Sequence, residues 1–210
     1  MKVSTSILSI NDNLKIAIDN LNNTSTDYIH LDIMDGIFVE NTTWNIDTLR
    51  SVLINNTKPL DIHLMVSDVK SYVDSFSTLK PEYITFHYEA IDDIDSIINY
   101  IKSLGIKVGM AIKPNTKIEE IFNYLPKLDL VLVMSVNPGM GGQEFILGTV
   151  EKINGLKNYK INNNLNYLIS VDGGINGNTI KLIRNADIAV SGSFITKNNY
   201  EESINILKNE

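Results

Sequence analysis

The stretch Tyr28–Gly36, YIHLDIMDG, reads as a buried β-strand that carries three ionisable residues. His30, Asp32 and Asp35 interrupt an otherwise apolar run. A parallel strand covered on both faces is expected to be almost continuously hydrophobic, and an ionisable group there costs free energy unless it is hydrogen-bonded, paired or bound to a metal. We therefore expect His30 and Asp32 to serve a function inside this strand.

Similar short runs recur along the chain and alternate with stretches of helical periodicity. Strands are expected at 2–8, 28–33, 60–66, 83–88, 107–112, 130–136, 167–173 and 188–194. Helices are expected at 12–21, 45–54, 68–76, 91–105, 116–125, 146–156, 176–185 and 200–209. Regular alternation predicts a parallel sheet, and eight units favour a closed (β/α)8 TIM barrel over an open doubly wound sheet. Because no linker or composition break divides 1–210, we expect one domain.

Composition narrows the classes of function. The net charge of −7 argues against nucleic acid, since a phosphate backbone needs clustered Lys and Arg. The chain has no cysteine, which excludes disulfides and thiolate metal sites. No apolar run approaches the roughly 20 residues of a membrane span, and the N-terminus lacks the pattern of a signal peptide. We expect a cytoplasmic protein without a membrane partner.

Several polar residues fall where the expected strands end, which is where barrels of this kind place their active sites. Alternation along a strand puts His30 and Asp32 on one face, and His63 and Asp172 end two further strands. If these faces point inward, the four side chains converge on a site for Zn²⁺ or Fe²⁺, or else Mn²⁺ or Co²⁺. The alternative is that each is a hydrogen-bonded core residue or a helix cap. We expect His87, in phase with Glu89, to have a supporting or structural role.

Glycines cluster in the expected turns after the last three strands. Gly173, Gly174, Gly192 and Ser193 follow the seventh and eighth strands, where such barrels commonly bind phosphate through backbone amides. The loop 137–145 is longer than a simple turn, and we interpret it as a lid that closes over substrate, with hinges at Gly139, Gly141 and Gly142. Plain turns and a static surface loop are the alternatives.

The chain resembles the ribulose-phosphate 3-epimerase family over essentially its whole length. The motifs that carry the resemblance are SILS (6–9), HLDIMDGIFVEN (30–41), LDIHLMV (60–66), FHYEA (86–90), MSVNPGMGGQEF (134–145), VDGGI (171–175) and SGS (191–193). The resemblance implies a metal-dependent epimerase that interconverts D-ribulose 5-phosphate and D-xylulose 5-phosphate at C3, a step of the pentose phosphate pathway, and a homo-oligomeric assembly.

The same resemblance implies a role for individual residues. Asp32 and Asp172 would be the acid/base pair, and His30, Asp32, His63 and Asp172 would hold one divalent metal ion. Substrate contacts would come from Ser6, from a group of three methionines and from the glycine turns named above: Met34, Met65 and Met134 beside the reacting carbons, Gly139, Gly141 and Gly142 in the loop, and Gly173, Gly174, Gly192 and Ser193 at the phosphate.

Some positions depart from the family's pattern. Glu40 stands where proline is usual, Trp44 and Asn45 lie in an altered stretch, Met140 replaces a phenylalanine, and Phe194 follows the last glycine turn. These changes put in doubt the shape of the loop after the second strand and the width of the phosphate pocket. The alternatives are an epimerase of a six-carbon ketose phosphate such as D-allulose 6-phosphate, a barrel that binds a sugar phosphate without turning it over, and a metal-free lyase or isomerase barrel.

Overall fold

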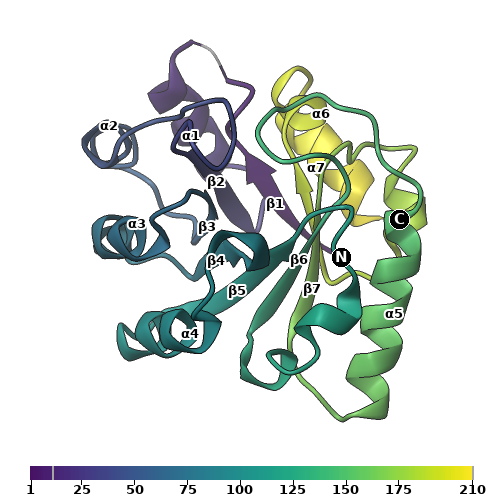
Figure 1. Cartoon of the computed structure of the whole chain (residues 1–210). Coiled ribbons are helices and arrows are strands. Elements are labelled where there is room, and N and C mark those ends of the chain that lie inside the picture. Colours follow the sequence, from purple (N-terminus) through teal and green to yellow (C-terminus); the bar gives the residue numbers. More distant parts are fainter. Residues whose placement is uncertain (11, 210) are drawn as a thin grey trace.

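The strands predicted from the sequence close into a barrel (Figure 1). The structure is a computed structural model that describes residues 1–10 and 12–209. All eight strands are parallel and pair in chain order, with β1 next to β8. They span β1 Lys2–Ser6, β2 Tyr28–Met34, β3 Leu60–Met65, β4 Tyr83–His87, β5 Lys107–Ile112, β6 Leu130–Met134, β7 Leu168–Asp172 and β8 Ile188–Ser191. The predicted (β/α)8 barrel is confirmed.

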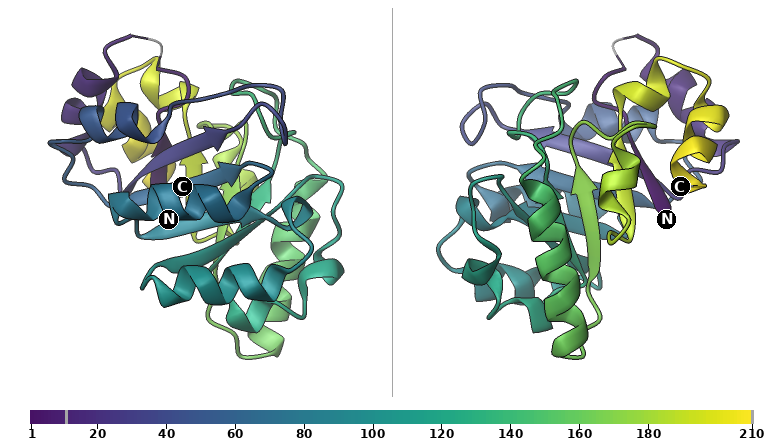
Figure 2. Two further views of the ribbon diagram at one scale, coloured as in Figure 1. Left: turned by 60° about the vertical axis from the view of Figure 1, so that its left-hand side comes forward. Right: turned by 90° about the vertical axis from the view of Figure 1, so that its right-hand side faces the viewer.

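Helices surround the strands on the outside of the barrel (Figures 1 and 2). They span α1 Leu14–Asn22, α2 Ile46–Val52, α3 Val69–Phe76, α4 Ile94–Ser103, α5 Thr149–Asn162, α6 Ser193–Thr196 and α7 Tyr200–Lys208. In α4 the spacing of Ile94, Ile97, Ile98 and Ile101 puts all four on one buried face, and the Asp93 side chain caps the first turn. Within residues 1–10 and 12–209, no helix is long and apolar enough to cross a membrane.

Two of the expected helices are wrong. Residues 116–125 form only short 3₁₀ segments at Ile118–Ile121 and Leu125–Lys127. Pro126 lies inside the second segment and has no N–H group with which an α-helix from 116–125 could continue. Residues 176–185 contain a single 3₁₀ segment, Ile180–Ile183. There the Asn176 side chain accepts hydrogen bonds from the amides of Asn178 and Thr179, so a side-chain turn replaces the first helical turn. Further 3₁₀ segments lie at Ser77–Leu79 and Tyr88–Ala90.

The barrel interior is divided into a polar half and an apolar half. Strands β1–β4 contribute buried polar side chains, which are Ser4, Ser6, His30, Asp32, Asp61, His63, Thr85 and His87. Strands β5, β6 and β8 contribute an apolar cluster that includes Ala111, Leu132, Met134 and Val190. A larger apolar layer between barrel and helices forms the main core. The strands that carry the polar side chains therefore pack outward against an apolar core.

Candidate active site

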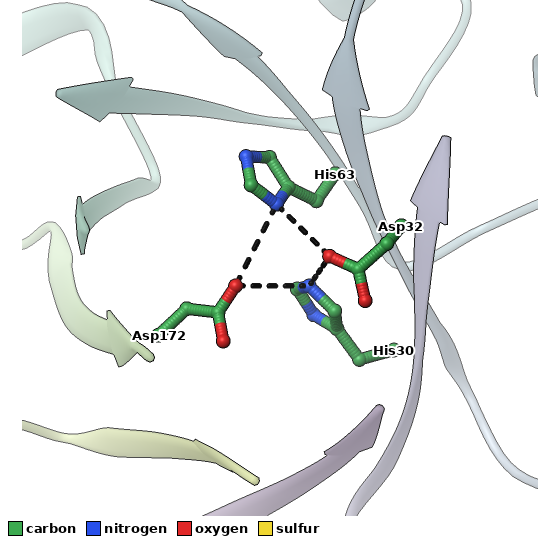
Figure 3. Close-up of side chains that lie close together, drawn as sticks. All are labelled: His30, Asp32, His63 and Asp172. Carbon is green, nitrogen blue, oxygen red and sulfur yellow. Dashed lines mark hydrogen bonds and ion pairs between the residues drawn. The ribbon is translucent and has the colours of Figure 1, made fainter. Parts of the chain in front are cut away.

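Strand register brings four of the predicted residues together at the mouth of the barrel. In the β2–β3 pairing Asp32 lies opposite His63, while His30 precedes Asp32 by two residues on the same face. Asp172 reaches the same point from the end of β7. One ligand atom from each of His30, Asp32, His63 and Asp172 lies within 4.8 Å of the others (Figure 3). The predicted convergence is therefore present in the structure.

His30 is held by a carboxylate behind it. Asp61 Oδ2 lies 2.8 Å from His30 Nδ1 and also accepts a hydrogen bond from Ser4 Oγ at 2.8 Å. Because a carboxylate only accepts, Nδ1 of His30 donates and Nε2 faces the cluster. Nε2 is buried and makes no hydrogen bond, although Asp32 Oδ1 lies 3.3 Å away as an ion-pair partner. Burial opposes a positive charge here, yet Asp32 and Asp61 together hold the pKa of His30 well above its ordinary value. The place beside Nε2 favours a cation, either a proton or a metal ion.

The two carboxylates of the cluster differ in their surroundings. Asp32 is 3% exposed and accepts a hydrogen bond from Ser6 Oγ at 2.7 Å. Burial favours its neutral form, but His30 and His63 outweigh this and hold the pKa of Asp32 below its usual range. For Asp172, burial and the negative charge of Asp32 raise the pKa to about 6. Asp32 therefore stays ionised to a lower pH than Asp172 does.

The spacing of the four ligand atoms suits one small divalent ion. His30 Nε2 lies 3.3 Å from Asp32 Oδ1 and 3.9 Å from Asp172 Oδ2. His63 Nδ1 lies 3.3 Å and 3.8 Å from the same two oxygens. Metal bonds of about 2.0–2.2 Å in a tetrahedral arrangement would separate ligands by about 3.3–3.6 Å. Two imidazole nitrogens and two carboxylate oxygens suit Zn²⁺, Fe²⁺, Mn²⁺ or Co²⁺. The residues therefore fit a metal ion.

A cavity of about 770 Å³ opens above the cluster. Asp32 and Asp172 line it, whereas His30 and His63 are fully buried behind them. All of the predicted substrate-contacting residues line the same cavity: Ser6, Met34, Met65, Met134, Gly139, Gly141, Gly142, Gly173, Gly174, Gly192 and Ser193. The three methionines are buried and form an apolar wall beside the carboxylates. The cavity thus joins a polar floor to an apolar side and a glycine-rich rim.

Two glycines of the rim have positive φ and no room for a side chain. Gly173 has φ +120°, and an added Cβ would lie 2.5 Å from Val136 Cγ2. Gly174 has φ +64°, and an added Cβ would lie 2.7 Å from the backbone nitrogen of Phe145. Glycine is therefore required for this close backbone approach, which also leaves amides accessible from the cavity.

The loop between β6 and α5 runs beside the loop between β2 and α2 (Figure 2). Asn41 Nδ2 donates to Gly139 O at 2.8 Å, which ties the two loops together. Gln143 Nε2 donates to the carbonyls of Asn137 and Met140 and so closes the β6–α5 loop on itself. Residues 137–145 of this loop line the cavity, and its closure as a lid stays a prediction.

The departures noted in the sequence lie around the cavity. Thr43 Oγ1 donates to the carbonyl of Asp32 and accepts from the amide of Met34, so the altered loop secures the end of β2. Asn45 caps α2 by accepting from the amide of Thr48. Glu40 and Trp44 do not line the cavity, whereas Met140, which is 61% exposed, and Phe194 do.

Sequence reasoning missed two residues of this site. Asp61 is a buried acid two residues before His63 in the same strand, which is the signal that identified Asp32. Lys197 lies just beyond the last glycine turn and is the one basic residue lining the cavity in the described part of the chain, against Asp32, Glu144 and Asp172. A lysine close after the phosphate-site motif in sequence was the available signal for it.

The fold and the site define a (β/α)8-barrel enzyme with a candidate metal centre. Solved structures of the same fold include 3-hexulose-6-phosphate synthase from Salmonella typhimurium, with TM-score 0.70, 17% identity and coverage of 100% of this chain and 97% of that one. Another is KGPDC from Streptococcus mutans, with TM-score 0.69, 14% identity and coverage of 99% and 95%. At these identities the likeness shows the fold alone.

Sequence comparison gives the family. A profile of the ribulose-phosphate 3-epimerase family matches residues 2–196. The ribulose-phosphate 3-epimerase of Helicobacter pylori (strain 26695) is 38% identical over 199 residues, covering 94% of this chain and 91% of that protein. The enzyme of that name from Methanocaldococcus jannaschii is 38% identical over 198 residues, covering 93% and 84%. The chain belongs to the ribulose-phosphate 3-epimerase family and is an epimerase.

Proposed function

We propose that this enzyme inverts C3 of a ketopentose phosphate, interconverting D-ribulose 5-phosphate and D-xylulose 5-phosphate, and that it depends on a divalent metal ion held by His30, Asp32, His63 and Asp172. The observation that carries the proposal is the convergence of these four ligand atoms within 4.8 Å at the floor of the cavity. Membership of the family supports the choice of substrate.

Inversion needs one proton removed from C3 on one face and one proton delivered on the other. Asp32 and Asp172 reach the cluster from β2 and β7, two strands separated by β1 and β8, so their carboxyl groups approach it from different sides (Figure 3). In each direction one carboxylate takes the proton and the other carboxyl group gives one, and the roles exchange in the reverse reaction. When bound, the metal ion would supply Lewis-acid stabilisation for the negative charge that develops on the substrate oxygens.

The remaining residues of the cavity would bind and orient the substrate. Ser6 donates to Asp32 Oδ2 and so fixes the orientation of that carboxylate. The methionines add no exchangeable proton near the reacting carbon. The phosphate would sit against the backbone at Gly173, Gly174 and Gly192, with Ser193 beside it. The loop that contains Gly139, Gly141 and Gly142 would exclude water when it closes.

The proposal extends to the organisation of the enzyme. It treats 1–210 as one catalytic domain, because all of the proposed groups come from a single barrel. It also includes assembly into a homo-oligomer and a location in the cytoplasm, as the resemblance to the family implies. Sedimentation of the purified protein at several concentrations measures the oligomeric state.

Proton NMR in D2O tests the reaction. Purified protein with added Zn²⁺, Fe²⁺, Mn²⁺ or Co²⁺ is expected to convert D-ribulose 5-phosphate to D-xylulose 5-phosphate with deuterium at C3. Asp172→Asn is expected to abolish turnover, whereas Asp47→Asn, a matched change at an acid whose side chain is 85% exposed, is expected to keep it. Removal of metal with a chelator is expected to stop the reaction reversibly.

No turnover of the pentose with any of these metals would refute the substrate assignment. Turnover of D-allulose 6-phosphate in the same assay would then move the assignment to a six-carbon ketose phosphate. Undiminished activity after complete removal of metal would refute the metal dependence and leave the epimerase assignment standing.

A further inference from the structure

Behind His63 lies a series of hydrogen-bonded polar side chains, His87 and the partly buried Glu89, neither of which lines the cavity. His63 Nε2 lies 2.9 Å from His87 Nε2, and His87 Nδ1 lies 3.1 Å from Glu89 Oε2. Both imidazoles are fully buried. The ring of Phe38 packs on His87 with centroids 4.9 Å apart, which helps to exclude water from the chain.

At Glu89, the far end of this series of hydrogen bonds, the donors and acceptors are fixed. Glu89 Oε1 accepts from the backbone N–H of Lys113 at 2.8 Å and from the hydroxyl of Thr116. Lys152 Nζ in turn donates to the carbonyls of Lys113 and Thr116 and so secures the segment that presents these donors. The carboxylate therefore has one oxygen committed to two donors and the other free to accept from His87.

The acceptor role of Glu89 determines which ring nitrogens of His87 and His63 donate. A carboxylate can only accept, so His87 Nδ1 carries the hydrogen and His87 Nε2, in the neutral ring, is an acceptor. His63 Nε2 must then donate, which leaves the lone pair of His63 Nδ1 pointing at Asp32 and Asp172.

We propose that Glu89 is a positioning residue for the metal site: through His87 it sets the direction of the hydrogen bonds so that His63 offers Nδ1 as a ligand. The inference rests on the proposed metal dependence and goes beyond it by assigning a role to two residues outside the ligand set. Groups behind metal-binding histidines commonly orient the ring and select its tautomer, and their loss typically weakens metal binding by about 10–100-fold.

Glu89→Gln reverses the direction of the hydrogen bonds between residue 89, His87 and His63 without removing the side chains that form them. The amide oxygen is expected to take the place of Oε1, because the backbone N–H of Lys113 cannot face an NH2 group. That puts the amide NH2 opposite His87 Nδ1, where donor meets donor. His87 would have to switch tautomer and donate from Nε2, and His63 would then carry its hydrogen on Nδ1. The ligand lone pair would be lost although every residue of the cluster is intact.

Thr116→Val is the matched control, because it removes a hydrogen bond to the other oxygen of the same carboxylate without reversing the chain. Zn²⁺ affinity, measured by competition with a chromophoric chelator, is expected to fall about 10–100-fold in Glu89→Gln and to be unchanged in Thr116→Val. Equal affinity in Glu89→Gln and the wild type would overturn the inference, as would an equal loss in both variants, which would indicate a merely structural effect.

A second measurement needs no variant. Nitrogen-15 NMR of the Zn²⁺-loaded wild-type protein is expected to show His87 as the neutral ring protonated at Nδ1. Protonation at Nε2 instead would overturn the inference even if Glu89→Gln failed to fold. The two failures are separable: a wild type that binds no Zn²⁺ refutes the proposed metal centre, whereas normal binding by the wild type with equal binding by Glu89→Gln refutes only the role of Glu89.

Discussion

Gly174→Ala is expected to destabilise the protein through a clash that can be measured separately from backbone strain. With φ at +64°, alanine at this position costs about 1–2 kcal/mol for the left-handed conformation. The added Cβ would also lie 2.7 Å from Phe145 N and 3.0 Å from both Gln143 O and Phe145 Cα. These are backbone atoms, so a rotamer change cannot relieve the contact. Overpacking of this kind costs about 1–3 kcal/mol.

Gly105→Ala provides the comparison. Gly105 has φ +74° and lies just after α4, and an added Cβ there would meet no atom within 4 Å. Gly105→Ala should therefore lower the unfolding free energy only by the cost of the left-handed backbone conformation. Urea unfolding of both variants is therefore expected to show a larger loss of unfolding free energy for Gly174→Ala, by about 1–3 kcal/mol. A difference below about 0.5 kcal/mol, the scale of neutral surface changes, would refute the reasoning, because it would mean that the loop yields without cost. Since Gln143 and Phe145 line the cavity, KM for the sugar phosphate should rise in Gly174→Ala only.

Three further changes test other parts of the site. Lys197→Gln should raise KM by a few-fold without lowering kcat, because an exposed ion pair contributes about 0.2–1 kcal/mol, and the effect should fade at high salt in steady-state kinetics. Asp61→Asn should weaken Zn²⁺ binding by about 10–100-fold in the chelator competition, because the carboxylate behind His30 is lost. For Asp35, burial favours the neutral acid, but amide hydrogen bonds from Ser67 and others outweigh it and hold the pKa below 3.8. The contribution of Asp35 is thus present above pH 3.8 and lost as pH falls through the lower folded pKa, so the stability deficit of Asp35→Asn in thermal unfolding should narrow below about pH 3.8.

The parts of the structure that were predictable are those governed by alternation along a strand. His30 and Asp32 stand two residues apart in an apolar run, so one inward face carries both. The same rule applied to Asp61 and His63 would have identified Asp61 as a buried partner. Asp61 lies two residues before His63, below the strand ends where substrates bind, so a search confined to strand ends does not reach it.

Some parts escaped prediction because of local backbone chemistry, and others because they depend on contacts between segments distant in sequence. The apolar spacing at 116–125 and 176–185 predicts helices, but the first stretch forms 3₁₀ segments, the second of which contains Pro126, and in the second stretch the Asn176 side chain bonds the backbone. The bond from Asn41 to Gly139 joins loops 98 residues apart, and no local pattern reveals it. The position of Lys197 on the cavity wall depends on α6, a helix that begins where the last strand was expected to continue.

Two separate series of hydrogen bonds lead to the cluster of His30, Asp32, His63 and Asp172. One runs from Ser4 and Asp61 to His30, and the other from Glu89 and His87 to His63. Each chain uses up one ring nitrogen of its histidine and directs the other nitrogen at Asp32 and Asp172. If His30 were only a satisfied core residue, its buried Nε2 would make a hydrogen bond, since a buried polar atom that makes none costs about 1–3 kcal/mol. The arrangement is explained if a cation occupies that point, and this makes the buried polar half of the barrel a support for the metal site that we propose.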